Sequence, residues 1–176
     1  MYPYLRMVKE LAWHRRSPRL ALGQVHRSHH ICWPWDIDVF GELNNGRTLT
    51  LFDLGRFGLF QRIGFLAAGR QRGWIGAVAG VSVRYKRRIR IFNRLEMRSR
   101  FAGWDARFAY CEQSLWHGET CCSHALVRLV VTGRDGIVPP SEIADALGYQ
   151  RESPSLPDWI ASWAAAEAKR PWPPMS

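Results

Sequence analysis

The sequence predicts an α+β fold in which an antiparallel sheet wraps one long helix. Residues 47–68 are apolar around most of the helical circumference, which is typical of a helix buried on all sides. Strand-like segments separated by turn sequences follow it, at residues 74–86, 93–103, 106–116 and 119–132. Because one helix cannot cover both faces and both edges of such a sheet, we expect a homodimer or a dimer of dimers.

The composition fits one folded domain with an anionic partner. The chain has 176 residues, of which 47% are hydrophobic, so a sizeable core is expected and disorder is not. Its formal net charge of +10 indicates an anionic ligand or surface without identifying it. On charge alone, nucleic acid, an acidic membrane and a phosphorylated cofactor all remain open.

Hydropathy and cysteine spacing bear on the compartment and on metal binding. The sequence contains no apolar run of about 18 residues, and its beginning lacks the apolar stretch of a signal peptide, so we expect a cytoplasmic protein. Cys32, Cys111, Cys121 and Cys122 form no Cys-x-x-Cys pair and no zinc-ligand spacing. We therefore expect buried cysteines, no metal site and no cofactor.

Residues 1–23 are interpreted as an N-terminal helical extension with a helix over residues 2–16. Its apolar residues fall near one face and are Tyr4, Leu5, Val8, Leu11 and Ala12. We expect that face to pack on the domain. The alternative is peripheral contact with a membrane surface, since the helix is basic and carries Tyr and Trp.

The main domain is expected over residues 24–135. It begins with an extended segment, and a polar turn then runs from Asp36 to Asn45. In the long helix, Gly55 and Gly58 let another part of the chain approach closely, and Gly69 and Gly73 are candidate ends.

Residues 136–176 are interpreted as a C-terminal helical extension. It follows a loop over residues 133–140. Short helices are predicted at residues 141–147, with Ser141 as the N-cap, and at residues 157–169.

The turn and the helix start carry a recognisable motif. From Asp36 the sequence reads DIDVFGELNNGRT and continues LTLFDLGR. Over residues 24 to 132 it resembles the hotdog-fold acyl-CoA thioesterases of the 4-hydroxybenzoyl-CoA thioesterase type. In that resemblance Asp38 matches the family's catalytic Asp, and Asn44 and Asn45 match its paired Asn residues. Asp53 and Arg56 match the family's later acidic residue and Arg.

The resemblance implies a hotdog fold and hydrolysis of an acyl-CoA thioester to a carboxylic acid and free CoA. Glu42 stands where the family commonly has His, and Thr48 where it has Tyr. Asp38 is expected to act as general base or as nucleophile, and sequence does not separate these roles. The structural alternative for Asp38 is an ordinary turn or cap residue.

The remaining candidate residues surround the helix start. Backbone amides around Leu43 and Gly46 are expected to stabilise the oxyanion. Asn44 and Asn45 either cap the helix or orient the substrate, and Glu42 is either a second acid/base or a solvated charge. Asp53 and Arg56, three residues apart on one helix face, are expected to pair.

A basic run is the candidate site for the CoA phosphates, which Arg and Lys side chains suit. It comprises Arg84, Lys86, Arg87, Arg88 and Arg90. The alternative is a solvated sheet face. Nucleic-acid binding is disfavoured because no nucleic-acid-binding motif is present. A hotdog protein that binds acyl thioesters without turning them over is the second functional hypothesis.

Overall fold

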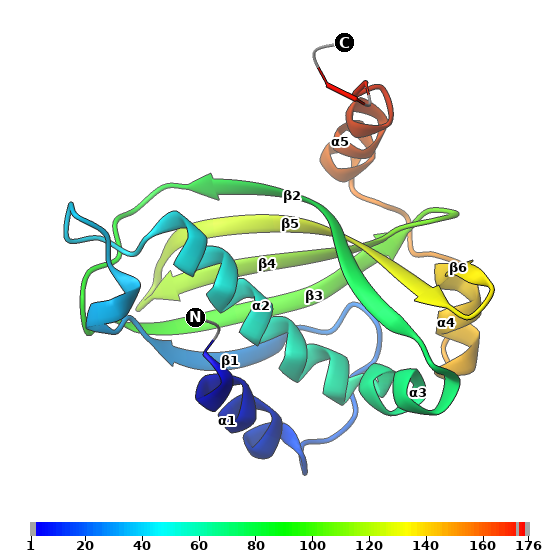
Figure 1. Cartoon of the computed structure of the whole chain (residues 1–176), viewed down its shortest axis with the longest axis horizontal. Coiled ribbons are helices and arrows are strands. Elements are labelled where there is room, and N and C mark those ends of the chain that lie inside the picture. Colours follow the sequence, from blue (N-terminus) through cyan, green and yellow to red (C-terminus); the bar gives the residue numbers. More distant parts are fainter. Residues whose placement is uncertain (1–2, 172, 175–176) are drawn as a thin grey trace.

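A curled antiparallel sheet forms the framework of the computed structural model, which describes residues 3–171 and 173–174. The strand order is β1-β3-β4-β5-β2, and β6 extends β5 as a hairpin (Figure 1). The strands are β1 (His26–Ile31), β2 (Ile75–Tyr85), β3 (Arg94–Trp104), β4 (Ala109–His117), β5 (Thr120–Gly133) and β6 (Gly136–Val138). This is the predicted α+β hotdog arrangement.

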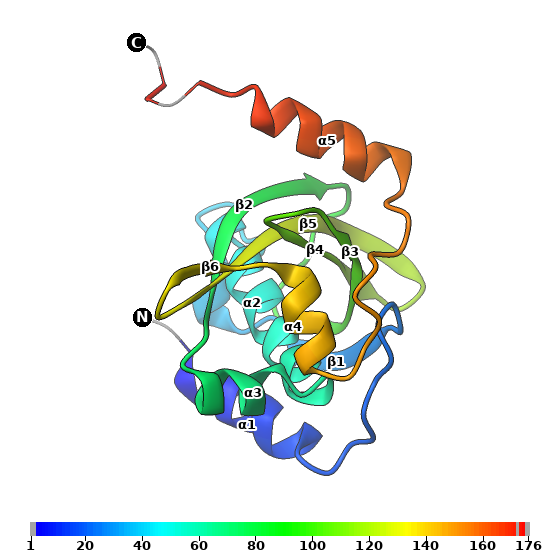
Figure 2. The same ribbon diagram turned by 90° about the vertical axis from the view of Figure 1, so that its right-hand side faces the viewer.

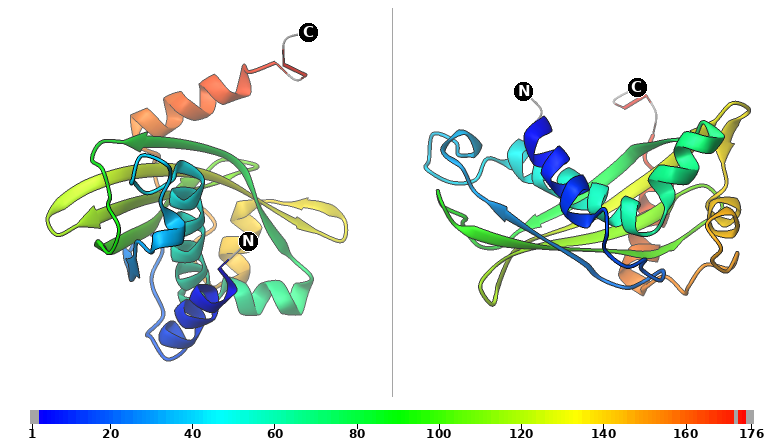
Figure 3. Two further views of the ribbon diagram at one scale, coloured as in Figure 1. Left: turned by 60° about the vertical axis from the view of Figure 1, so that its left-hand side comes forward. Right: turned by 90° about the horizontal axis from the view of Figure 1, so that it is seen from below.

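The central helix α2 (Asn45–Arg62) lies on the concave face of the sheet (Figure 3). The prediction of a single helix over residues 47–68 is wrong. Helix α2 ends before Ile63, its C-cap, and the chain continues as a separate helix, α3 (Phe65–Arg72). Gly64 takes a φ of 88°, which is the left-handed conformation that ends helices. The next left-handed glycine, Gly73, ends α3 as predicted.

Two glycines bring α2 against the sheet. A Cβ at Gly55 would lie 2.6 Å from Cγ of Met97, and one at Gly58 would lie 2.4 Å from Nε2 of His26. Each glycine therefore removes the atom that would otherwise hold β1 and β3 away from the helix. This close packing confirms the expectation placed on both residues.

The core follows α2 along its length. Near its start, Leu51, Phe52 and Leu54 are fully buried among side chains of β3, β4 and β5. Near its end, Leu59 and Ile63 pack in a second cluster that includes residues of β5 and the C-terminal segment. Within the described residues no helix has the length and hydropathy needed to cross a bilayer.

The N-terminal helix α1 (Tyr4–His14) packs beside α2, but with the opposite face from the one expected. Its buried residues are polar: Glu10 is 1% exposed and His14 is 9% exposed. The apolar Leu5 is 88% exposed and Val8 57%. Buried Glu10 lies 2.8 Å from Lys9 Nζ and 3.6 Å and 3.9 Å from His14 and His30, so a polar cluster, together with Met7, makes the contact instead of the expected apolar face.

The two edges of the sheet differ. At the β1 edge, the side chain of Lys9 donates to the His29 carbonyl at 2.8 Å, and Arg6 donates to the Ile31 carbonyl at 2.9 Å. Helix α1 thus closes this edge. Strand β2 forms the other edge and is exposed along most of its length.

The C-terminal segment differs from its prediction in two details. The expected loop over residues 133–140 contains β6. In α4 (Pro140–Ala146), Pro139 is the N-cap, so Ser141 lies inside the helix and does not cap it. Helix α5 (Asp158–Ala168) lies on the sheet face opposite α2, where Ile160 is fully buried (Figure 2).

Candidate functional site

The turn before α2 is built around a buried carboxylate, Asp36. Its Oδ2 accepts from Arg6 Nη2 at 2.5 Å and from the Trp33 amide at 3.0 Å, and its Oδ1 accepts from Arg47 Nη2 at 2.8 Å. Burial alone would raise the pKa of Asp36, but these hydrogen bonds hold that pKa below its usual value. Asp36 therefore ties α1, the turn and α2 together.

Asp38, the expected catalytic residue, is half-buried in the same turn. Its Oδ1 accepts from the amides of Phe40 at 2.9 Å and Glu42 at 3.4 Å. Within the described residues its Oδ2 has no hydrogen bond. Asp38 therefore shapes the turn with one oxygen and leaves the other available to a ligand.

Asn44 is the N-cap of α2. Its Oδ1 accepts from the amides of Gly46 at 2.9 Å and Arg47 at 3.3 Å, and the Leu43 amide donates to the Ile89 carbonyl at 2.9 Å. The amides of Leu43 and Gly46, expected to be free for an oxyanion, are thus already bonded. Of the α2 first-turn amides in the described chain, the one at Asn45 has no acceptor.

A cavity of about 260 Å³ joins the start of α2 to the basic run. Antiparallel pairing of β2 with β5 positions the basic run so that it faces the helix start. The cavity is lined by Glu42, Leu43, Asn45, Thr48, Tyr85, Lys86, Arg87, Arg88, Ile89 and Ser123.

The predicted site residues do not all meet in this cavity. The predicted site residues absent from its lining are Asp38, Asn44, Gly46, Arg84 and Arg90. Arg88 Nε lies 2.9 Å from Glu42 Oε1, so the residue at the usual His position forms an ion pair with the basic run. The lining residues Tyr85 and Ser123 were not predicted, because only the pairing of β2 with β5 brings them to the helix start.

The Asp53–Arg56 element forms the expected pair on α2. Arg56 Nη2 donates to Asp53 Oδ1 at 2.8 Å, and Arg56 Nη1 donates to Gln113 Oε1 at 2.7 Å. Gln113 in turn donates to the Phe52 carbonyl and the Ser99 hydroxyl. This buried network anchors α2 to β3 and β4, while Asp53 itself borders a groove of about 290 Å³ between α2 and β2.

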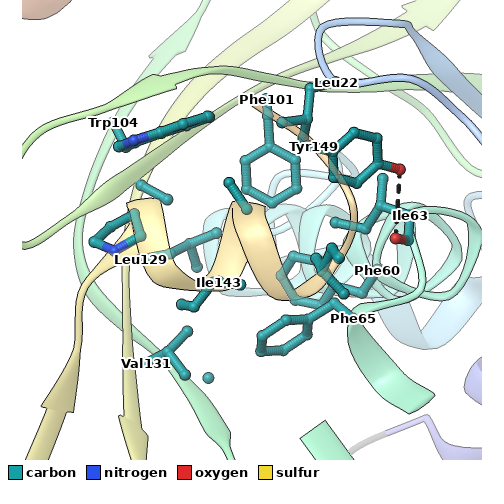
Figure 4. A pocket seen from close by; sticks show the side chains of 15 residues that line it. Leu22, Phe60, Ile63, Phe65, Phe101, Trp104, Leu129, Val131, Ile143 and Tyr149 are labelled. Carbon is teal, nitrogen blue, oxygen red and sulfur yellow. Dashed lines mark hydrogen bonds between the residues drawn. The ribbon is translucent and has the colours of Figure 1, made fainter. Parts of the chain in front are cut away.

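A second cavity, of about 60 Å³, lies at the other end of α2 (Figure 4). Its walls come from α2, α3, the sheet and α4, and its floor and roof are apolar side chains such as Phe60, Phe65 and Ile143. The Tyr149 hydroxyl at its rim donates to the Leu20 carbonyl. Sequence reasoning did not identify this cavity, because its walls are ordinary apolar residues far apart in the chain.

The sequence profile of the thioesterase-like superfamily matches residues 32–164, which covers the turn, α2 and the whole sheet after β1. The chain belongs to this superfamily. Among its relatives, Protein THEM6 of Xenopus laevis is 28% identical over 145 residues, which are 81% of this chain and 68% of the relative. Protein THEM6 of Danio rerio is 33% identical over 131 residues, 73% of this chain and 63% of the relative.

Solved structures support the same fold. A probable thioesterase from Bartonella henselae is 21% identical, with a TM-score of 0.59 over 66% of this chain and 98% of its own. The DHNA-CoA thioesterase of Staphylococcus aureus is 15% identical, with a TM-score of 0.61. The match covers 82% of this chain and 91% of that one. A further Staphylococcus aureus protein of the same fold was solved in complex with CoA. It is 10% identical with a TM-score of 0.61, and the match covers 81% of this chain and 95% of that one.

Proposed function

We propose that this thioesterase-like protein hydrolyses an acyl-CoA to a carboxylic acid and free CoA. The observation that carries the proposal is the cavity that joins the α2 start to Lys86, Arg87 and Arg88. A helix N-terminus and three cations facing one cavity suit a phosphorylated thioester, because both favour negative charge. The CoA-bound structural relative supports a ligand of this type.

In this proposal the basic run holds the CoA phosphates. Lys86, Arg87 and Arg88 contact them inside the cavity, and Arg84 and Arg90 flank it. Arg88 has to exchange its Glu42 partner for a phosphate, which is feasible because Arg88 is 75% exposed at its side chain. An exposed ion pair contributes only about 0–1 kcal/mol, so a multiply charged phosphate can displace it.

The chemistry requires a base and an oxyanion donor. The free Oδ2 of Asp38 takes a proton from water as the water oxygen bonds to the thioester carbon. The free Asn45 amide donates to the resulting oxyanion, and the carbonyl re-forms as the carbon–sulfur bond breaks and the CoA thiolate leaves. A nucleophilic Asp38, passing through an anhydride, remains the other role for the same oxygen.

A second copy completes the site in this proposal. Asp38 lies in the turn beside the basic cavity and not in its lining, so one chain alone leaves the carboxylate at the margin. The β2 edge is open, with Ile75 69% exposed, whereas α1 closes the β1 edge. Pairing of two β2 edges would form a dimer that buries this edge and encloses the α2–β2 groove.

The test is a thiol-release assay on a panel of acyl-CoA esters. We expect Asp38→Asn to lower kcat by about 100-fold or more, as for loss of a general base. Asp105→Asn is the matched control, because that carboxylate also accepts from two backbone amides of a turn and lines neither the cavity nor the groove. Unchanged turnover in Asp38→Asn with an intact fold would remove Asp38 from the mechanism.

The second candidate is an acyl-thioester-binding protein without turnover. The Glu42–Arg88 ion pair favours it, because the residue at the family's usual His position serves to hold a cation. In that case acyl-CoA esters would raise the melting temperature, while no ester in the panel would release free thiol. Release that depends on Asp38 would exclude this alternative.

A further inference from the structure

The first inference concerns the acyl group and rests on the proposed function. The 60 Å³ cavity beneath α4 shares Phe60, Phe65, Gly76 and Leu129 with the groove that runs along α2 and β2 from Asp53. The two spaces are therefore adjacent, and these residues line both. Phe60 and Phe65, with ring centroids 5.4 Å apart, form the boundary.

The boundary is built so that it can open. Gly76 faces the ring of Phe65, and a Cβ there would lie 3.4 Å and 3.5 Å from two ring atoms. Because Gly76 has no side chain, no side-chain atom at that position blocks a movement of the Phe65 ring toward β2. Such a movement would join the groove to the cavity, whose lining side chains are nearly all apolar, with Trp104 and Tyr149 carrying polar atoms (Figure 4).

Size and polarity select the ligand. A cavity of this volume with a nearly wholly apolar lining disfavours water and accepts hydrocarbon. From the α2 start to Phe60 the helix rises about 22 Å, at 1.5 Å per residue. A short or aromatic acyl group attached to CoA at the α2 start does not extend that far. We infer that the substrate is a long-chain aliphatic acyl-CoA whose terminal carbons occupy the cavity beneath α4.

The test fills the cavity from α4. Ala144 is 5% exposed and lines it, so Ala144→Phe is expected to abolish release of thiol from palmitoyl-CoA while butanoyl-CoA turnover is retained. Ala146→Phe is the matched control, because Ala146 lies on the same helix and lines a different pocket. Displacement of a fluorescent fatty acid by palmitate gives a readout independent of hydrolysis and should be lost only in Ala144→Phe.

The outcomes separate this inference from the proposed function. Palmitate binding that is lost in Ala144→Phe, with no thiol released from any ester, supports the chain site and ends the hydrolase proposal. Wild-type turnover of butanoyl-CoA but not palmitoyl-CoA overturns the inference. Equal palmitate binding by the wild type and Ala144→Phe does so as well.

A second inference rests on α1 and is independent of the first. The face of α1 that points away from the domain carries the apolar stripe of Tyr4, Leu5 and Val8, with Tyr4 63% exposed. Trp13 beside it is 78% exposed. The domain-facing side holds Glu10 and His14 with Met7, so the three apolar residues of the stripe are turned outward.

Charge decides what covers this stripe. Arg15 and Arg16 follow directly on α1 and are exposed, and among the described residues neither forms an ion pair. A second copy placed stripe to stripe with its helix parallel would bring these cations together, which is unfavourable, and an antiparallel copy would leave them without an anionic partner. An anionic lipid surface complements them, and it also accommodates Tyr and Trp at its boundary. We propose that α1 docks the protein on an anionic membrane surface.

The test is co-sedimentation with phosphatidylcholine vesicles that contain or lack phosphatidylglycerol. We expect binding only to the anionic vesicles, with release at high salt, and loss of binding in Leu5→Glu/Val8→Glu. Val25→Glu, which introduces one charge at a valine 44% exposed outside α1, is the control and should bind normally. Absence of wild-type binding, or undiminished binding by the double variant with an unchanged melting temperature, overturns the proposal.

Discussion

The contact between Gly58 and His26 gives a quantitative prediction about how α2 is placed. In a helix interior Ala is favoured over Gly by about 1 kcal/mol, so Gly58→Ala in an open helix would stabilise the fold. Here the added Cβ would lie 2.4 Å from Nε2 and 3.0 Å from Cε1 of His26. The His26 ring is buried and held by Arg62 Nη1 at 3.3 Å and by an edge contact with His14.

Because that ring has little freedom to move, α2 and β1 must separate. Overpacking of this kind costs about 1–3 kcal/mol, which offsets the helical gain, so we expect Gly58→Ala to lower the free energy of unfolding by about 1 kcal/mol. In a His26→Ala background the two closest contacts are gone and only Cδ2 of His14, at 3.2 Å from the added Cβ, remains, so the same substitution should be neutral or should stabilise by up to about 1 kcal/mol. The destabilising effect should therefore disappear in that background.

Urea denaturation of the four proteins in this cycle measures the coupling. Gly55→Ala is the internal control, because its Cβ meets the flexible Met97 side chain and not His26, so its effect should be the same in both backgrounds. An equal effect of Gly58→Ala with and without the imidazole would refute the reasoning. It would mean that the helix does not approach β1 at this position as closely as the structure places it.

Three further predictions follow from the buried polar groups. Burial lowers the pKa of both His26 and His30 to about 3, against about 6.5 in an unfolded chain, so the unfolded state takes up protons first. Stability should be constant above pH 6.5 and should fall by about 1.4 kcal/mol per pH unit for each histidine as the pH drops toward 3, which urea midpoints would show. Asp36→Asn, which leaves two guanidinium groups without their carboxylate, should cost about 3–5 kcal/mol by thermal melting, and a loss below about 1 kcal/mol would contradict its structural role. Burial raises the pKa of Cys111 to about 12, so in thiol titration of the folded protein the partly exposed Cys121 should react first and Cys111 only on unfolding.

The sequence predicted the sheet well, because alternation and turn residues act locally. Each strand from β2 to β5 begins and ends within a few residues of its expected range. The break at Gly64 was missed because an apolar run continues across it, and only the backbone conformation separates α2 from α3. Hydrophobic periodicity located the α1 stripe but did not decide which side of the helix meets the domain.

The candidate site was predictable in part. The motif placed Asn45 and Glu42 at the helix start, and charge alone singled out the basic run around Lys86. That they share one cavity depends on long-range strand pairing, which local sequence does not encode. The two amides predicted for the oxyanion are already bonded, because the Asn44 cap accepts from Gly46 and the Ile89 carbonyl accepts from Leu43.

The two acidic residues of the Asp-x-Asp turn have different roles: Asp36 is structural, and Asp38 carries the proposed chemistry. Asp36 is fully buried and saturated by Arg6, Arg47 and a backbone amide, so it has no oxygen left for a substrate. Asp38, two residues later, engages one oxygen in the turn, and no group among residues 3–171 and 173–174 hydrogen-bonds to the other. A general base needs a free lone pair and a fixed position. Asp36 fixes the position of Asp38 because it holds the turn to both helices. Loss of activity in Asp38→Asn without loss of stability, against loss of both in Asp36→Asn, is the pattern that this division of roles requires.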